Sequence, residues 1–227
     1  MTKTKIILLV LISIFTASQK IKAQDWPNLE KYKSANEKLE SPKSDENRVV
    51  FMGNSITESW PQTFFHGKPY VNRGISGQTT PQMLLRFRQD VINLQPKVVL
   101  ILAGTNDIAK NTGPITLEEI RDNILSMVEL ARANNITPVV CSVLPAYDYP
   151  WREEKLQPNI KIPKLNGMLK SMAANQKVPY LDYFSEMADD RNGLPKELTT
   201  DEVHLTPKGY AILGKMAEAQ IAKVLKR

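Results

Sequence analysis

Short apolar runs alternate with longer amphipathic stretches along most of this 227-residue chain, and this alternation constrains the fold more than any other feature. The runs are rich in β-branched residues and are apolar throughout, which is typical of parallel strands buried on both faces. The intervening stretches have helical periodicity. Strands are predicted at 48–52, 70–72, 97–102, 136–143 and 178–181, and helices at 81–94, 117–134, 159–175 and 207–224. The pattern predicts an α/β fold in which helices cover both faces of a parallel sheet.

The first 23 residues have the composition of an export signal. Lys3 and Lys5 precede an apolar run over 6–15, and a short polar stretch then leads to Ala23. The run is too short to cross a bilayer, which takes roughly 20 residues. We therefore expect residues 1–23 to be a signal peptide, with an uncleaved membrane anchor as the alternative. The mature protein is expected to be periplasmic or secreted, without stable membrane insertion.

The rest of the chain suits a single domain preceded by a short helical segment. Residues 24–47 are predicted as this N-terminal helical segment, and residues 48–227 as the domain that carries the chemistry. The segment holds a set of apolar residues expected to pack on the outside of the domain: Trp26, Leu29, Tyr32 and Leu39.

Charge and cysteine content exclude some classes of protein. The formal net charge is +6, but four of these charges are lysines of the leader, which contains no acidic residue, so two remain on the mature chain. No clustered basic patch for nucleic acid is predicted. The single cysteine, Cys141, lies in an apolar run and is predicted to be a buried small hydrophobic residue.

Two polar clusters follow predicted strands, at the edge where parallel sheets bind ligands. In residues 53–57, a glycine allows a sharp turn and Ser55 would present its hydroxyl beside the free N–H groups of a helix start. The alternative is that Ser55 is only a helix N-cap. In residues 103–107, Asn106 would project a side-chain amide into the same region, as an oxyanion donor or as a turn residue.

Two further clusters complete the pattern. Residues 72–80 contain two glycines, which alone indicate only a loop. In residues 201–207, Asp201 and His204 precede a helix that begins at Thr206 and Pro207. Their spacing lets the carboxylate hold one ring nitrogen of His204 while the other faces a serine, which is the arrangement of a general base and its orienting partner. The other histidine, His66, has no acid nearby in sequence and is predicted to be structural or exposed.

These four motifs, in this order, resemble those of the SGNH hydrolases, also called GDSL-like lipases and esterases. The likeness spans essentially the whole mature chain and implies a flavodoxin-like three-layer α/β/α sandwich with about five parallel strands. It implies that Ser55 is the nucleophile, His204 the general base and Asp201 its partner. Asn54 stands where aspartate is usual in the first motif, and Ala103 stands where glycine is frequent in the third.

The resemblance also implies an oxyanion hole and a reaction without a cofactor. The donors would be the backbone N–H groups of Ser55 and Gly77 and the amide of Asn106, with Gly74 as the alternative to Gly77. The reaction would be acyl transfer through an acyl-serine. No metal is implied, and no set of metal ligands is evident in the sequence.

The substrate is less constrained. Tyr147, Tyr149 and Trp151 follow the fourth strand and are expected either to line the cleft and contact a sugar or to pack against their own loop. Export and aromatic residues favour O-acetylated carbohydrates, with a lysophospholipase or a thioesterase as alternatives. A flavin-binding module is a different class of function, but it leaves Asn106 and the Asp201–His204 pair unexplained. A sugar-binding relative without hydrolase activity would be expected to have lost part of the triad, which is complete in this sequence.

Overall fold

The computed structural model describes residues 24–226, and its centre is a sheet of five strands. All neighbouring strands are parallel, in the order β2-β1-β3-β4-β5. The strands are β1 (Val49–Gly53), β2 (Tyr70–Gly74), β3 (Val98–Leu102), β4 (Thr137–Cys141) and β5 (Tyr180–Leu181). This is the flavodoxin-like order, so the predicted fold is confirmed.

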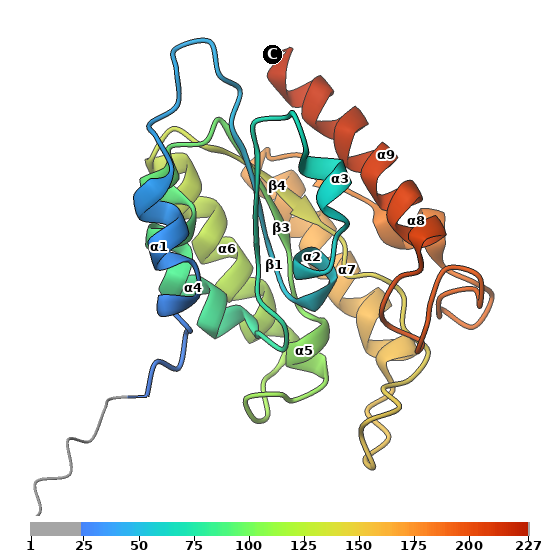
Figure 1. Cartoon of the computed structure of the whole chain (residues 1–227). Helices are drawn as coiled ribbons and strands as arrows, with labels where there is room; N and C mark the ends of the chain where they lie inside the picture. The colour runs from blue at the N-terminus through green and yellow to red at the C-terminus, as the bar shows by residue number, and fades with distance from the viewer. Residues whose placement is uncertain (1–23, 227) are drawn as a thin grey trace, which may run out of the picture.

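Helices cover both faces of the sheet (Figure 1). One face carries α4 (Thr80–Asp90), α6 (Leu117–Ala133) and α7 (Pro158–Gln176), with α1 (Glu30–Lys38) outside α4. The other face carries α2 (Ser55–Glu58), α3 (Gln62–Phe65), α8 (Tyr183–Met187) and α9 (Pro207–Leu225). Two short elements, η1 (Ile92–Leu94) and α5 (Thr105–Ile108), flank β3.

Alternate residues of each strand face opposite layers, so the sheet divides the core in two. On β1, Val50 and Met52 pack toward α4, α6 and α7, while Val49 and Phe51 pack toward α3 and α9. All four side chains are buried. The continuous apolar runs in the sequence therefore reflect burial on both faces.

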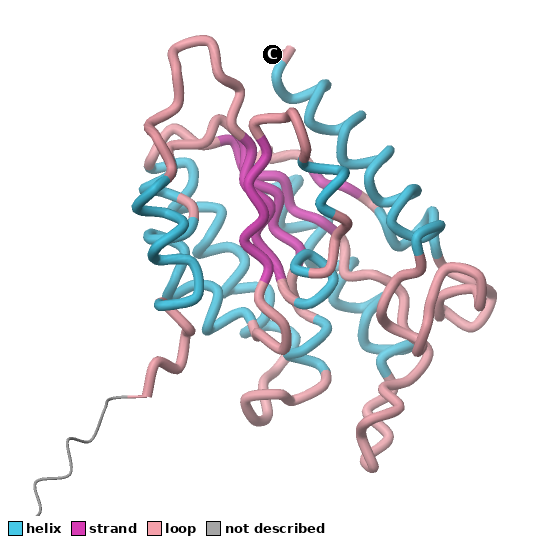
Figure 2. Tube along the Cα trace, in the orientation of Figure 1, coloured by secondary structure: helices cyan, strands magenta, loops and turns pink. Residues whose placement is uncertain are grey.

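The carboxyl ends of the parallel strands lie at one edge of the sheet, and the predicted polar clusters follow these strand ends. Strand order reverses between β1 and β3, and in such sheets the ligand crevice lies outside the carboxyl ends of the strands at this point. In Figure 1, α2 and α5 follow β1 and β3 at the lower edge of the sheet. Figure 2 shows that long loops also gather toward this edge.

The predicted N-terminal helical segment is a single helix, α1, with no buried side chain. It is attached through polar contacts: the Tyr32 hydroxyl donates to the Gly74 carbonyl, and the Arg73 guanidinium lies 4.7 Å from the centroid of the Tyr32 ring. Leu39 packs against the core, whereas Trp26 is 40% exposed. The set of apolar residues predicted to pack on the domain therefore does so only in part.

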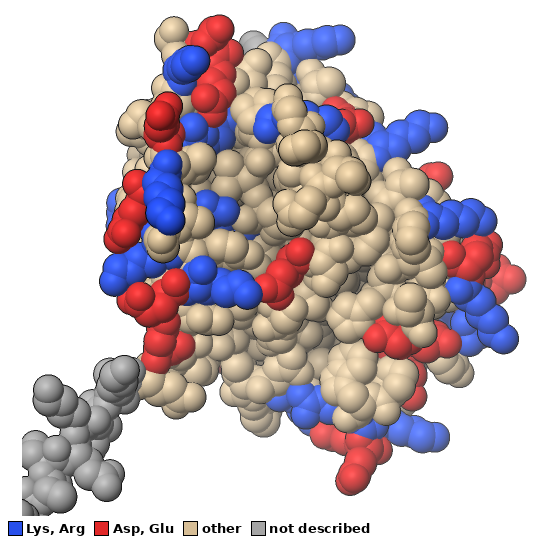
Figure 3. Space-filling model, viewed as in Figure 1, with Lys and Arg blue, Asp and Glu red and all other residues tan. Residues whose placement is uncertain are grey.

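The predicted signal peptide, residues 1–23, lies outside the residues that the structure describes. Within residues 24–226, no helix combines the length and apolar character needed to cross a membrane. The face of the molecule in Figure 3 carries charges of both signs, mixed along its rims around a largely uncharged centre.

Candidate active site

Ser55 is the first residue of α2, directly after the turn that leaves β1. Asn54, not Ser55, is the N-cap of this helix: its side-chain oxygen accepts a hydrogen bond from the Ile56 N–H at 3.0 Å. The Ser55 hydroxyl is therefore not used for capping. Its Oγ lies 3.0 Å from His204 Nε2, a contact between residues 149 positions apart in sequence.

Asp201 holds His204 at both its backbone and its ring. Asp201 Oδ1 accepts from the His204 N–H at 2.7 Å, and Oδ2 lies 2.6 Å from His204 Nδ1. Because a carboxylate is only an acceptor, Nδ1 carries the proton and donates it. His204 Nε2 is then the acceptor for the Ser55 hydroxyl, which is the tautomer that a general base requires.

The loop around His204 is also held through the His204 backbone carbonyl. The His204 carbonyl accepts from the Thr200 N–H and from the Thr199 hydroxyl, both at 2.9 Å. Partial burial raises the pKa of Asp201, but hydrogen bonds from His204 and from the Val203 N–H outweigh it, leaving the pKa below its ordinary value. Asp201 is consequently a carboxylate at neutral pH, which suits its predicted role as the partner of His204.

Asn106 lies on α5 and is 6% exposed. Its Nδ2 donates to the Gln78 carbonyl at 3.0 Å, which connects the α5 turn to the loop after β2. Asn111 Nδ2 donates to the neighbouring Gly77 carbonyl, also at 3.0 Å. This loop is joined to β1 as well, because the Ile75 N–H donates to the Gly53 carbonyl at 3.0 Å.

The two glycines predicted as alternative oxyanion donors differ in their environments. The Gly74 N–H already donates to Asn72 Oδ1 at 2.9 Å, and a Cβ at Gly74 would lie 2.1 Å from the Glu58 backbone nitrogen. Gly74 is thus needed for close packing of β2 against α2. Gly77 has φ +76°, which favours glycine, and a Cβ there would meet nothing closer than 3.9 Å.

The three predicted substrate-contacting aromatic residues lie in different environments. Trp151 is 46% exposed, and its ring centroid is 6.3 Å from that of His204. Tyr147 is 43% exposed, with the Arg191 guanidinium over its ring. Tyr149 does not lie on the cleft surface, so the prediction that it contacts substrate is wrong. It is 1% exposed, and its ring packs against Trp151. Its hydroxyl donates to the Thr105 carbonyl at 2.9 Å, so it anchors the aromatic loop to α5.

The remaining candidates lie away from this chemistry. Cys141 is buried in β4, and burial raises the pKa of its thiol far above the ordinary value, so it is an unreactive core residue. His66 is exposed at the end of α3. Among residues 24–226, no group of three or more histidine, cysteine or carboxylate side chains is arranged to hold a metal ion.

Comparison with known proteins identifies the family. The model of the GDSL-like lipase/acylhydrolase family matches residues 51–212. This chain belongs to the GDSL-like lipase/acylhydrolase family. It is a carboxylic ester hydrolase, as the sequence motifs predicted.

Individual relatives agree with this assignment. A GDSL-like lipase of known structure from Bacteroides thetaiotaomicron is 44% identical, covers 87% of this chain and 98% of its own, and superposes with a TM-score of 0.85. The human platelet-activating factor acetylhydrolase IB subunit alpha2 is 30% identical over 196 residues, which are 81% of this chain and 80% of that protein. The lipoprotein YqeF of Bacillus subtilis is 26% identical over 63% of this chain and 69% of its own.

Sequence reasoning missed the buried polar residues behind the site. Gln78 and Arg86 are 3% and 0% exposed, and Asp107, directly after Asn106, is 1% exposed. Arg86 and Asp90 are one helical turn apart and form a buried ion pair. That i, i+4 spacing was the available signal, but it equally predicts an exposed pair on a helix surface.

Proposed function

We propose that this chain is an exported serine esterase in which Ser55 is the nucleophile, His204 the general base and Asp201 its orienting partner. The observation that carries the proposal is the continuous chain of contacts from Ser55 Oγ through both ring nitrogens of His204 to Asp201 Oδ2, at 3.0 and 2.6 Å. A nucleophile, a base and an orienter within hydrogen-bonding distance are what acyl transfer through a serine requires.

In this mechanism Ser55 Oγ attacks the carbonyl carbon of the ester while His204 Nε2 takes the hydroxyl proton. The negative charge that develops on the carbonyl oxygen is stabilised by the N–H groups of Ser55 and Gly77 and by the Asn106 amide. His204 then donates its proton to the departing alcohol, which leaves an acyl-serine. Water, deprotonated by the same imidazole, hydrolyses the acyl-serine and regenerates Ser55.

We favour O-acetylated carbohydrates as the substrates. Trp151 and Tyr147 are both partly exposed, and Trp151 lies beside the imidazole of His204, whereas Arg191 covers one face of the Tyr147 ring. Flat aromatic side chains at the mouth of a site suit the apolar face of a sugar ring. The relative named platelet-activating factor acetylhydrolase adds support for a small acyl group. Lysophospholipids and acyl thioesters are the competing substrate classes.

Export of the protein is supported by the composition of residues 1–23 and by a relative named as a lipoprotein. It is tested by expressing the full chain in a Gram-negative host and measuring the N-terminus of the protein recovered from the periplasm. Cleavage after Ala23 or close to it is the expected result. Recovery of only uncleaved chain from the membrane would support the membrane-anchor alternative.

The nucleophile is tested with a fluorophosphonate probe and with Ser55→Ala. The wild-type protein should be labelled at Ser55 and should hydrolyse p-nitrophenyl acetate, while folded Ser55→Ala should do neither. Near-normal turnover by Ser55→Ala would refute the assignment. The substrate class is tested by incubating the protein with acetylated xylan, acetylated pectin, a lysophospholipid and an acyl-CoA, and comparing the rates of acid release. Faster release from the lysophospholipid or the acyl-CoA would overturn the carbohydrate preference.

A further inference from the structure

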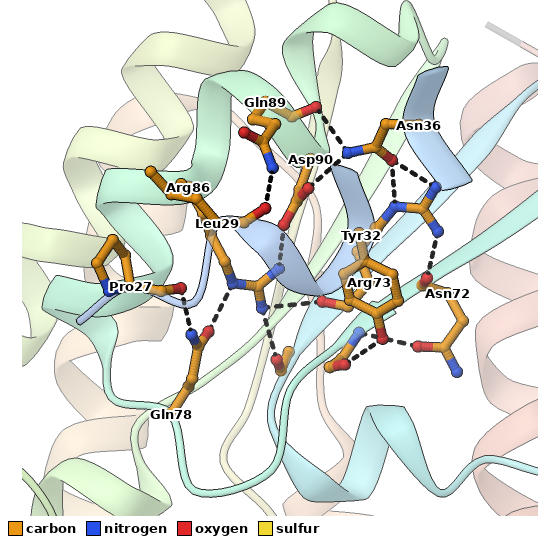
Figure 4. Close-up of polar contacts among 12 residues, drawn as sticks. Pro27, Leu29, Tyr32, Asn36, Asn72, Arg73, Gln78, Arg86, Gln89 and Asp90 are labelled. Atoms are coloured by element: carbon orange, nitrogen blue, oxygen red, sulfur yellow. Dashed lines mark hydrogen bonds and ion pairs between the residues drawn. The ribbon is translucent and has the colours of Figure 1, made fainter. Parts of the chain in front are cut away.

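A buried glutamine connects the proposed oxyanion hole to the N-terminal segment. Gln78 is 3% exposed, and its backbone carbonyl is the acceptor for Asn106 Nδ2. Its side chain is bound at both ends: Oε1 accepts from Arg86 Nε at 2.5 Å, and Nε2 donates to the Pro27 carbonyl at 2.7 Å (Figure 4). The residue that orients Asn106 is therefore itself held from two sides.

Arg86 ties this glutamine to the ends of two strands. It is fully buried on α4, and its Nη2 donates to the carbonyls of Gly53 at 3.0 Å and Arg73 at 2.9 Å. Gly53 ends β1 two residues before Ser55, and Arg73 lies near the end of β2, ahead of Gly77. Because a guanidinium is a rigid planar fork, one side chain fixes these carbonyls and Gln78 relative to one another.

The N-terminal segment closes the network. Arg86 Nη1 pairs with Asp90 Oδ2 at 2.9 Å, and Asp90 Oδ1 accepts from Asn36 Nδ2 at 2.7 Å. Asn36 Oδ1 in turn accepts from Arg73 Nε at 2.9 Å and from Nη2 at 2.6 Å. Figure 4 shows these side chains converging from α1, α4 and the β2 end. Each buried polar group here has a partner, so loss of one leaves others unpaired.

We propose that Gln78 is a positioning residue of the oxyanion hole, held in place by Arg86 and by the backbone of the N-terminal segment at Pro27. This proposal rests on the proposed function, because it takes Asn106 to be an oxyanion donor. Such a donor accelerates the reaction only if it is aimed before charge develops. The Gln78 carbonyl takes one hydrogen of the Asn106 amide and so sets the direction of the other. The N-terminal helical segment is then part of the catalytic unit, although none of its side chains is in the catalytic triad.

The test is a double-mutant cycle with Gln78→Met and Asn106→Ala, assayed on p-nitrophenyl acetate in the full chain. Gln78→Met removes both side-chain hydrogen bonds and keeps the volume and the backbone carbonyl. We expect it to lower kcat by about 10- to 100-fold, since small misplacements of catalytic groups have effects of this size, with KM within about twofold. In the Asn106→Ala background, the loss caused by Gln78→Met should be at least threefold smaller.

Gln89→Met is the matched control. Gln89 Nε2 donates to the Leu29 carbonyl at 2.6 Å, so it also attaches the N-terminal segment to α4, but it forms no hydrogen bond with the loop that carries Gly77. Its kcat should stay close to that of the wild type. Gln78→Glu, which keeps an acceptor for Arg86 and loses the hydrogen bond to Pro27, is assayed alongside so that the test does not depend on one variant folding.

The outcomes separate the two proposals. Equal losses of kcat on both backgrounds, or no loss when Asn106 is present, would overturn the positioning role of Gln78. A normal kcat for Asn106→Ala alone would instead count against the proposed oxyanion hole. A loss for Gln89→Met equal to that for Gln78→Met would mean that the N-terminal segment acts through general stability, which also overturns the proposal.

Discussion

Asp107 should make the stability of this protein fall as the pH rises from about 4 to 7. It is 1% exposed, and burial raises its pKa from 3.8 to about 6, although hydrogen bonds from Thr80 act in the opposite direction. The Thr80 hydroxyl donates to Oδ1 at 2.6 Å and the Thr80 N–H donates to it at 2.9 Å. No cation is paired with this carboxylate among the described residues. The folded state therefore holds the proton more tightly than the unfolded chain does.

The sign and size of the effect follow from linkage. A carboxyl with a raised pKa contributes stability that is fully present below pH 3.8 and is lost as the pH rises through about 6. The difference between the two pKa values corresponds to about 3 kcal/mol of unfolding free energy. Asp107→Asn removes the titration while keeping an oxygen for Thr80. The unfolded chain is already partly ionised at pH 4, so the difference in unfolding free energy, wild type minus variant, should decrease by about 2.5 kcal/mol between pH 4 and pH 8.

The assay is urea unfolding of both proteins at several pH values, followed by tryptophan fluorescence and far-ultraviolet circular dichroism. The prediction concerns how the difference in unfolding free energy changes with pH. Its absolute size at a single pH is not predicted, because the asparagine variant also changes the hydrogen bonds to Thr80 at every pH. Asp45→Asn, at an exposed carboxyl before β1, controls for the chemical change. A pH-independent difference between wild type and Asp107→Asn would refute the reasoning. A difference that grows with pH would mean that Thr80 stabilises the carboxylate by more than burial destabilises it.

Three further predictions concern the site itself. Asp201→Asn should lower kcat by about 10²–10⁴-fold with little change in unfolding temperature, because the amide no longer selects the Nδ1–H tautomer of His204; a steady-state assay with normal kcat would contradict the triad. Trp151→Ala should raise KM for acetylated oligosaccharides several-fold more than KM for p-nitrophenyl acetate, and equal changes would argue against a sugar platform. Tyr149→Phe should lower the unfolding free energy by about 1 kcal/mol through loss of its buried hydrogen bond to the Thr105 carbonyl, and an unchanged urea midpoint would mean that this contact contributes nothing.

The fold was predictable because burial on both faces leaves a continuous signal in the sequence. The predicted strand at 97–102 matches β3, and the predicted helix at 117–134 matches α6 to within one residue. The strand predicted at 136–143 is shorter in the structure, where β4 runs from Thr137 to Cys141, although Ser142 and Val143 remain buried. The Ser142 N–H still donates to the Leu181 carbonyl, but the Val143 N–H donates to the Asn166 side chain of α7 and not to a strand, a contact that periodicity does not reveal.

The contacts of the site could be predicted from the sequence only where the residues are close along the chain and each residue has one evident role. Asp201 and His204 are close in sequence, so their contact follows from local geometry. For Ser55, the sequence left capping and catalysis open, because serine suits both. In the structure Asn54 is the N-cap of α2, so the Ser55 hydroxyl does not cap this helix.

The supporting residues could not be assigned because their roles depend on contacts between distant segments. Gln78 binds Pro27, 51 positions earlier in sequence, and Tyr149 binds Thr105, 44 positions earlier. Nothing local distinguishes a glutamine that holds a catalytic loop from one exposed on a loop. For Tyr149 the sequence left a cleft position and packing within its own loop open for the same reason: a tyrosine hydroxyl suits a buried partner as well as a sugar.

The two halves of the site differ in how they are held, and the difference matches their chemical tasks. The side chains of His204 and Asp201 are 37% and 41% exposed, whereas Asn106 and Gln78 are buried. A base needs only the correct tautomer and direction, which Asp201 supplies through short local hydrogen bonds, and some access for the alcohol and water that exchange protons with it. Oxyanion donors must instead stay aimed at a point where charge appears only briefly, in a site of low dielectric constant. If the proposed oxyanion hole is correct, that requirement accounts for a buried arginine, a buried glutamine and an additional helix behind a loop that would contribute only one or two N–H groups to catalysis.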